Sequence, residues 1–428
     1  MNKNKDTLII GFALFSMFFG AGNLIFPPYI GLTSGSSWLI SFLGFILGDV
    51  GIIFLSIIAV SKAGSLQGVI GRAGKKFGIT LELLMMLCLG PILVIPRTAA
   101  TTFEMSILPL FNNVNPYIFS IVFFSITLIL TIKPNKVMDI IGKFLTPVLL
   151  LALACLIIKG IVSPIGSLED VNSNNLFING LTQGYQTMDA LGIGGIVALV
   201  MTSFMSKGYT DKNEKISLTI KASLIACVGL ALVYGGLTYL GATSSALYDS
   251  NIAQTTLLIN ITSSLLGTTG TIILAIVVGF ACLTTAVGLT SVTGKYFEDV
   301  TNKKLKYEHI VIFICIFSAL VSNLGVDKII QVAIPILSLI YPVSIVLVIM
   351  NIFKNVFTND ITLKGAAYAT LLVSLLNVID SLGFNINIVH KLPLANLGFN
   401  WIVPAIIGGI LATLISKVTE SKCSENIS

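Results

Sequence analysis

The first apolar segment of this chain is interrupted near its middle by the motif Phe-Gly-Ala-Gly-Asn-Leu-Ile-Phe-Pro-Pro at residues 19–28. Glycine lacks the side chain that shields a helical backbone, and proline lacks the N–H group that a helix needs. Unpaired backbone groups are costly in lipid and are tolerated only where they face protein or a water-filled cavity. The motif therefore predicts a transmembrane helix that unwinds at a midplane site, as in secondary transporters.

The composition places the whole chain in a lipid bilayer. Hydrophobic residues make up 55% of the chain and charged residues 10%, and the mean hydropathy is +0.96, so a water-facing surface could not be covered. Apolar runs of about 20 residues predict an all-α polytopic protein, with twelve spans at 8–32, 38–61, 80–108, 116–132, 138–160, 178–205, 215–241, 268–293, 307–324, 329–352, 362–382 and 398–416.

The run at 252–266 is apolar but short and rich in Thr, Ser and Asn. It is predicted to be a lid or interfacial helix and not a further span.

Basic residues predict the orientation of the chain. The loops on one side of the predicted spans hold most of the Lys and Arg residues, and the opposite loops hold only Lys159, Lys328 and Lys391. Because basic loops stay on the cytoplasmic side, we expect both termini to be cytoplasmic. The net charge of +6 then reflects topology and contact with anionic lipid, and it indicates no nucleic-acid partner. The first span lacks a small-residue cleavage site, so we expect no cleavable signal.

The sixth span carries a second interruption, Gly-Tyr-Gln-Thr-Met-Asp-Ala-Leu-Gly-Ile-Gly-Gly at residues 184–195. Span one runs outward and span six inward, which predicts two inverted five-helix repeats, 8–160 and 178–352, with two further helices at 362–416, all within one transporter domain, 1–428. Asp189 falls near the bilayer centre, where a carboxylate usually marks a substrate or ion path. The alternative is an aspartate buried for helix packing.

Span eight contains Ala281, Thr284 and Thr285 on one helix face, since they are three and four residues apart. One carbonyl and two hydroxyl oxygens can converge there, and oxygen is the ligand that a hard cation prefers. The alternative is that each threonine bonds back to its own helix.

Four charged residues within spans are further candidates. Arg97 and Glu104 lie seven residues apart on roughly one face, which predicts a structural salt bridge or an outer gate. Asp49 in span two either pairs with a basic residue or lines the transport path. Lys143 in span five either extends to the membrane surface or serves in coupling.

These motifs together resemble the bacterial branched-chain amino acid:cation symporters of the BrnQ type. The resemblance rests on residues 12–28, on Gly90-Pro91 with Ile-Pro-Arg-Thr-Ala at 95–99, on 184–189 and on the Thr284-Thr285 pair, and it extends over essentially the whole chain. It implies a LeuT-type fold, a five-plus-five inverted repeat with two further helices. It also implies uptake of leucine, isoleucine and valine across the cytoplasmic membrane, driven by sodium or, in some members, by protons.

The resemblance also implies a site. The free N–H groups of the outer half of span one would bind the substrate carboxylate, and carbonyls of span six with Asp189 would bind the ammonium group. Phe19, Met188 and Ala281 are candidates for the apolar wall. The Met188-Asp189 pair departs from the neutral residues of the neurotransmitter-transporter branch, so a second ion or a proton remains an alternative there. The implied substrate residues are Gly20, Ala21, Gly22, Asn23, Tyr185, Gln186, Thr187, Met188 and Asp189, and the implied sodium ligands are Ser16, Phe19, Ala281, Thr284 and Thr285.

Two other functional classes fit the sequence less well. A membrane-embedded enzyme would need catalytic motifs, and the chain has neither His-Glu-x-x-His nor Gly-x-Ser-x-Gly, with His309 and His390 its only histidines. A channel fits less well because this one chain already supplies paired broken helices and an enclosed site. Uncoupled current without saturation would indicate a channel. We expect no cofactor beyond the coupling ion, and the oligomeric state stays open.

The orientation can be tested by thiol labelling. Cysteines placed at Ser167 or Asn175 should react with an impermeant reagent from outside intact cells, because these residues lie in a loop predicted to be external. Cysteines placed between Lys207 and Lys215 should react only after the cells are opened. The reverse labelling pattern would contradict the topology.

Overall fold

The protein is built from helices throughout the part of the chain that the structure describes. The computed structural model describes the backbone of residues 2–20, 22–111, 113–132, 136–171 and 175–425, and within these ranges it describes side chains except at 136–146, 148–149 and 417–425. The helices are α1 (Lys3–Phe18), α2 (Gly22–Leu32), α3 (Trp38–Ile46), α4 (Ile52–Ala63), α5 (Leu66–Ile70), α6 (Lys75–Leu87), α7 (Val94–Thr102), α8 (Pro116–Ile132), α9 (Lys136–Val162), α10 (Leu176–Tyr185), α11 (Ile193–Ser206), α12 (Lys212–Ala242), α13 (Gln254–Val300), α14 (Tyr307–Ser322), α15 (Val326–Ile352), α16 (Asp360–Ile379), α17 (Asn387–Lys391) and α18 (Ile402–Glu425).

The helices match the predicted spans. In the described residues, seven helical segments are long and apolar enough to cross a bilayer, the bent pair α1 and α2 counts as one more, and four shorter apolar helices occupy the remaining predicted spans. Long apolar side chains lie exposed on the outer helices, such as Leu232 on α12 with 73% of its surface exposed. Such exposure suits contact with lipid tails.

Span one is broken where the glycine and proline motif predicts. α1 ends at Phe18, α2 begins at Gly22, and the two helices are bent by 71°. Pro27 and Pro28 lie inside α2, in its second turn. Because a proline nitrogen cannot donate, the carbonyls of Asn23 and Leu24 lose the intrahelical partners that they would otherwise have.

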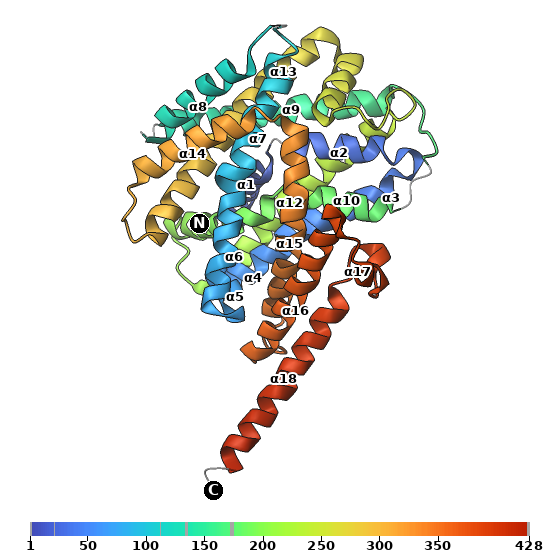
Figure 1. The fold of residues 1–428 in the computed structure, drawn as a ribbon. Coiled ribbons are helices and arrows are strands. Elements are labelled where there is room, and N and C mark those ends of the chain that lie inside the picture. Colours follow the sequence, from blue (N-terminus) through green and yellow to red (C-terminus); the bar gives the residue numbers. More distant parts are fainter. Residues whose placement is uncertain (1, 21, 112, 133–135, 172–174, 426–428) are drawn as a thin grey trace.

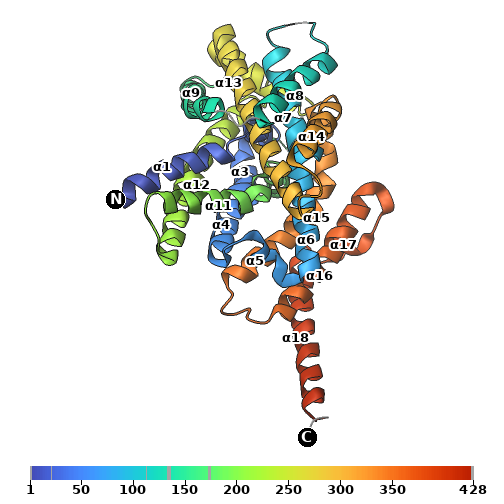
Figure 2. The same ribbon diagram turned by 90° about the vertical axis from the view of Figure 1, so that its left-hand side faces the viewer.

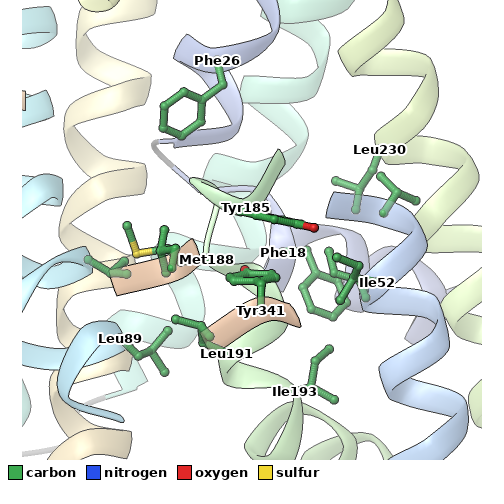
Figure 3. Close-up of a cluster of buried hydrophobic side chains, with 14 of the residues drawn as sticks. Phe18, Phe26, Ile52, Leu89, Tyr185, Met188, Leu191, Ile193, Leu230 and Tyr341 are labelled. Carbon is green, nitrogen blue, oxygen red and sulfur yellow. The ribbon is translucent and has the colours of Figure 1, made fainter. Parts of the chain in front are cut away.

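Span six is broken at Gln186–Met188, between α10 and the 3₁₀ turn at Asp189–Gly192 that leads into α11. Met188 has a φ of +66°, in the left-handed region that non-glycine residues rarely adopt. The surrounding structure must therefore hold Met188 in place. Figure 3 shows it among buried apolar side chains that include Leu89 and Tyr341.

Glycines bring span two and span six into backbone contact. Gly44 and Gly48 in span two face Gly180 and Gly184 in α10, and each pair has the small-xxx-small spacing of closely packed membrane helices. A Cβ atom at Gly180 would lie 1.9 Å from the carbonyl oxygen of Ser41. The four glycines therefore fix the distance between span two and the break in span six.

The predicted lid is a separate arm. Gly267 has a φ of +64° and interrupts α13, so residues 254–266 leave the direction of the rest of that helix. Figure 1 shows α13 in yellow at the edge of the molecule, near α9. The structure thus separates the arm at 254–266 from the rest of α13, and its role as a lid or interfacial helix stays a prediction.

Loops predicted to share one side of the membrane lie together. Lys207 pairs with Asp6 at 2.8 Å and Lys3 pairs with Glu214 at 2.6 Å, which joins the chain start to the loop after α11. On the opposite side, the Ser36 hydroxyl donates to Asp170 at 2.5 Å. Both groupings agree with the predicted alternation of loops.

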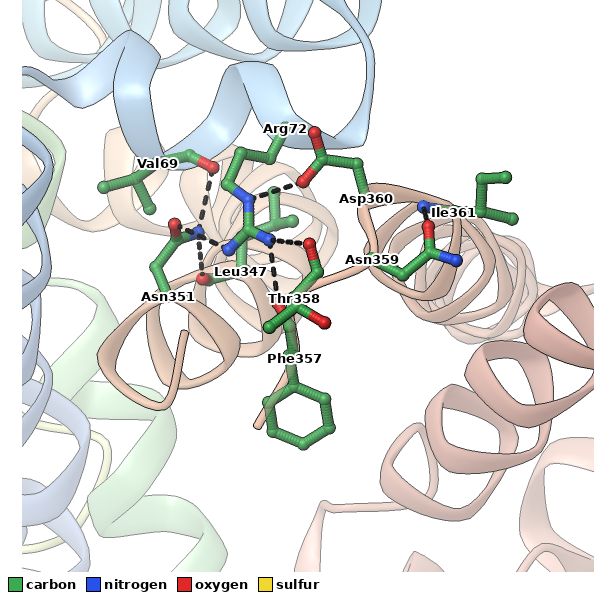
Figure 4. A network of polar contacts seen from close by, with 9 residues as sticks. All are labelled: Val69, Arg72, Leu347, Asn351, Phe357, Thr358, Asn359, Asp360 and Ile361. Carbon is green, nitrogen blue, oxygen red and sulfur yellow. Dashed lines mark hydrogen bonds and ion pairs between the residues drawn. The ribbon is translucent and has the colours of Figure 1, made fainter. Parts of the chain in front are cut away.

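The last helices form a layer of their own. α16 and α18 cross at Gly365 and Gly408, where a Cβ at Gly365 would lie 2.2 Å from the Gly408 carbonyl oxygen. Figures 1 and 2 both show α18 projecting beyond the other helices. Arg72 ties this layer to the core, because its guanidinium bonds Asp360 at 2.7 Å and the Phe357 carbonyl at 2.8 Å (Figure 4).

The glycine contact predicts the effect of one added methyl group. Gly180→Ala should lower the melting temperature of the purified protein, because overpacking a close contact costs about 1–3 kcal/mol. Gly288→Ala is the matched control, since a Cβ at Gly288 meets nothing within 4 Å and alanine favours a helix. Equal melting temperatures for the two variants would show that spans two and six can separate at no cost.

Candidate functional site

The two helix breaks meet at the side chains of Asn23 and Asp189. The Asn23 Nδ2 group donates to Oδ2 of Asp189 at 2.6 Å and also contacts the hydroxyl of Tyr234. Asn23 is buried in the first turn of α2, and Asp189 begins the turn after the break in span six. The structure therefore brings together two site residues that are 166 positions apart in the chain.

Arg97 joins the same two breaks from span three. Its Nη1 donates to the Gln186 carbonyl at 2.5 Å and its Nη2 donates to the Thr187 carbonyl at 3.2 Å. The guanidinium also lies 5.4 Å from the centre of the Phe26 ring, and a Cβ at Gly22 would come within 2.8 Å of Nη2. A planar guanidinium can serve two carbonyls at once, so it satisfies backbone groups that unwinding has released.

The predicted pairing of Arg97 with Glu104 is wrong. Glu104 instead accepts a hydrogen bond from the Thr255 hydroxyl at 2.6 Å and from the backbone N–H of Val326 at 2.9 Å. The seven-residue spacing assumes a regular helix, but residues 103–107 form a π turn, which changes the direction in which Glu104 points. Glu104 therefore connects span three to the lid arm and to the start of α15.

A small cavity of about 70 Å³ lies between the breaks. Its wall includes eight of the predicted site residues, and these are Gly20, Gly22, Asn23, Arg97, Thr187, Met188, Asp189 and Thr285. Met17, Leu89, Ile196 and Leu289 also line it, each on the half of its helix predicted to face the cytoplasm. The cavity thus extends from the helix breaks toward that side.

Two other predicted substrate residues, Gln186 and Tyr185, do not line this cavity. Gln186 is buried and is held through its carbonyl by Arg97. Tyr185 stacks on Tyr341 of α15 with ring centres 4.5 Å apart, as Figure 3 shows. Ala21 lies outside the described residues. Of the predicted apolar wall, Met188 reaches the cavity, while Phe19 stacks between Phe15 and Tyr234.

The candidate sodium ligands are only partly assembled. Thr285 faces the cavity together with Gly20 of span one, while Thr284 donates to the Ala281 carbonyl at 2.8 Å. The donor set consists of hydroxyl and carbonyl oxygens, which fits a hard cation such as sodium. Ser16 and Phe19 lie in the last turn and the C-cap of α1. The side chain of Lys143 lies outside the described residues, so its role in coupling stays a prediction.

Sequence reasoning missed Tyr234 and left Asp49 undecided. Tyr234 lies in the last third of α12, buried, with its hydroxyl against Asn23. Glycines explain its approach, because a Cβ at Gly241 would lie 1.8 Å from the Pro28 carbonyl oxygen. Asp49 is buried in a π turn of span two, and its Oδ1 lies 2.8 Å from the Thr187 hydroxyl. An acid at midspan depth was the available signal for Asp49, and no local pattern singles out Tyr234.

Known proteins resemble this chain over nearly its full length. A family model described as "Branched-chain amino acid transport protein" matches residues 3–419. The chain is 33% identical over 424 residues to "Branched-chain amino acid permease BrnQ" of Bacillus subtilis (strain 168), with 96% of each chain covered. It is 34% identical over 426 residues to "Branched-chain amino acid permease BraB" of the same organism, again with 96% of each covered.

Solved structures share the fold. The structure "Inward facing conformation of Mhp1" has a TM-score of 0.64 at 13% identity and covers 96% of this chain and 91% of its own. The structure of MhsT in complex with L-phenylalanine has a TM-score of 0.56 at 15% identity and covers 95% of this chain and 98% of its own. The predicted LeuT-type fold is therefore confirmed.

The contacts of Arg97 predict local loosening in a charge-preserving variant. Arg97→Lys keeps the charge, but one ammonium lacks the planar fork that serves two carbonyls, so a charge-assisted bond of about 1.5–3 kcal/mol is weakened or lost. Backbone amides at residues 186–191 should exchange with deuterium roughly tenfold faster or more. Amides in the middle of α16, which does not contact Arg97, are the internal control. Unchanged exchange at 186–191 would show that Arg97 does not hold this segment.

Proposed function

The chain belongs to the branched-chain amino acid transport protein family, and from that premise we propose that it is a secondary active symporter that imports leucine, isoleucine and valine together with sodium. Its curated relatives are named permeases, so the chain is a multi-span membrane transporter and not an enzyme. The observation that carries the proposal is the meeting of two broken helices at one cavity, with Asn23, Arg97 and Asp189 in its wall.

The polar groups of this cavity suit an amino acid zwitterion. The substrate carboxylate would dock at the free N–H groups that begin α2, where the helix dipole is positive and Arg97 lies nearby. The substrate ammonium would be held by Asp189 and by carbonyls at the end of α10. Met188 with Leu89 and Ile196 supplies the apolar surface that a branched side chain needs.

Transport requires this cavity to change size. Its volume of about 70 Å³ is far below the roughly 300–1,000 Å³ usual for ligand pockets. Substrate would therefore bind only after the walls move, as expected where one five-helix repeat, 8–160, moves against the other, 178–352. We place both termini in the cytoplasm, so the cavity residues of the inner helix halves would form the release path.

Sodium, when bound, would supply positive charge between the end of α1, beside the break in span one, and α13 of span eight. Thr285, Thr284 and the Ala281 carbonyl would hold it from α13, and Ser16 and Phe19 would add backbone carbonyls from the end of α1. These groups belong to two helices that must approach each other, so ion and substrate would favour the same arrangement. Coupling to protons through Asp189 or Lys143 is the alternative.

One reconstitution tests the proposal. Purified protein in potassium-loaded proteoliposomes should accumulate radiolabelled leucine under an imposed sodium gradient, and unlabelled isoleucine and valine should compete. Accumulation that follows a proton gradient alone would replace sodium by protons. Absence of accumulation under both gradients, with correctly folded protein, would refute the symporter.

The sodium site predicts a specific kinetic effect. Thr285→Ala removes one hydroxyl ligand, a contact of about 1.5–3 kcal/mol, so the sodium concentration for half-maximal uptake should rise by roughly 10- to 150-fold. Leucine affinity should fall at low sodium and recover at high sodium, because the two ligands are linked. Thr285→Ser keeps the oxygen and is the control, with a small effect. Normal uptake by Thr285→Ala at limiting sodium would remove Thr285 from the site.

A further inference from the structure

Asp49 is a buried carboxyl that the proposed substrate and sodium sites do not use. It lies in a π turn, Leu47–Gly51, at the middle of span two, with 1% of its surface exposed. π turns inside helices frequently mark functional positions. Close packing holds it against span six, because a Cβ at Gly184 would lie 2.9 Å from the Asp49 nitrogen.

The hydrogen-bond donors around Asp49 are too few for an ionised carboxylate. The Thr187 hydroxyl lies 2.8 Å from Oδ1 of Asp49 and also 2.8 Å from the Gly184 carbonyl oxygen. A hydroxyl has one hydrogen, so it cannot donate fully to both oxygens. The second carboxyl oxygen, Oδ2, is buried and makes no hydrogen bond of good geometry. The polar group beside it is the Tyr234 hydroxyl.

A protonated Asp49 satisfies these contacts. The carboxyl O–H donates to the Thr187 oxygen, and the Thr187 hydroxyl then donates to the Gly184 carbonyl, so each hydrogen has one acceptor and each short contact has one hydrogen. An ionised Asp49 would compete with Gly184 for the Thr187 hydrogen and would have, in a buried setting, only the neutral Tyr234 hydroxyl beside Oδ2, which is unfavourable for a charge.

The charges near Asp49 favour the same state. Among the described residues no cation forms an ion pair with it, since Arg97 on α7 is engaged by carbonyls of span six and faces Asp189. The remaining titratable groups that face Asp49 are Asp189 after the break, Cys227 and Tyr234 of α12 and Tyr341 of α15, while Tyr185 of α10 stacks on Tyr341. Of these only Asp189 is an acid of comparable strength, and a negative charge there disfavours a second one at Asp49.

We propose that Asp49 is a proton-binding site, and that Thr187 links its proton to the unwound segment of span six. Loss of the proton to water would leave a carboxylate that draws the Thr187 hydroxyl away from the end of α10. That segment also carries Asp189 and the carbonyls held by Arg97. Protonation of Asp49 would therefore stabilise the contacts of this segment with Arg97 and Asn23. The proton site at Asp49 does not depend on which ion drives uptake. Only the leucine-binding test of this site rests on the proposed function.

Infrared spectroscopy tests the proton directly. The full chain in lipid at neutral pH should show the carbonyl-stretch band of a buried protonated carboxyl. The band should be lost in Asp49→Asn, whose amide keeps one donor and one acceptor, and retained in Asp189→Asn. Absence of the band in the parent protein, or its persistence in Asp49→Asn, would overturn the proposal.

A second pair of variants assigns the band without changing the acid itself. Thr187→Val removes the acceptor of the Asp49 O–H, so the band should move to higher frequency. Thr187→Ser keeps the hydroxyl and should leave the band in place. A band that does not move in Thr187→Val would place the proton elsewhere. This comparison serves even if Asp49→Asn does not fold.

Leucine binding tests the link to span six. At constant sodium, leucine affinity of the parent protein should fall as pH rises through the range where the band disappears, and should lose up to about tenfold per pH unit for one linked proton. Asp49→Asn should bind leucine with little dependence on pH. An unchanged pH profile in Asp49→Asn would refute the link. If the parent protein binds no leucine at any pH, the proposed function fails, and the infrared result alone decides the proton site.

Discussion

Backbone groups freed by unwinding must find partners when no water is available, and the rest of this structure follows from how they do so. In span six the freed carbonyls of Gln186 and Thr187 are taken by Arg97. The guanidinium is itself buried, and Asp189 of the same break is the acidic residue that faces it. Arg97 also covers Gly22 at the start of α2. One cation thus stabilises both broken helices and fixes their distance.

Glycine contacts make this arrangement possible. Span two approaches α10 through Gly44, Gly48, Gly180 and Gly184, and α12 approaches α2 through Gly241. In lipid, helices associate through close packing and polar contacts because burial of apolar surface gives no net gain. These contacts place Asp49 against Thr187 and Tyr234 against Asn23. Glycines, which have no side chain, therefore bring the polar residues of the centre within reach of one another.

Hydropathy and local motifs could predict the spans, both breaks and the lid run, because each depends on neighbouring residues in the chain. They could also predict Asn23, Asp189 and Thr285 as members of one site, since a resemblance to a known family supplied the pairing. The partner of Arg97 could not be predicted, because a π turn at residues 103–107 changes the helical phase on which the prediction rested. Tyr234 lies 211 positions from Asn23, and no local pattern reports that contact.

The Glu104 contacts have a kinetic meaning. One carboxylate bonds both Thr255 of the arm at 254–266 and the first backbone N–H of α15, so a single side chain gives both elements a polar contact with span three. Any movement that takes Thr255 away from span three breaks its hydrogen bond to Glu104 and leaves this carboxylate with the Val326 N–H. Because a partly buried carboxylate that loses a donor is destabilised, this separation has a barrier of its own. The empty carrier, which has no substrate binding energy to offset that barrier, would be slowed by it most.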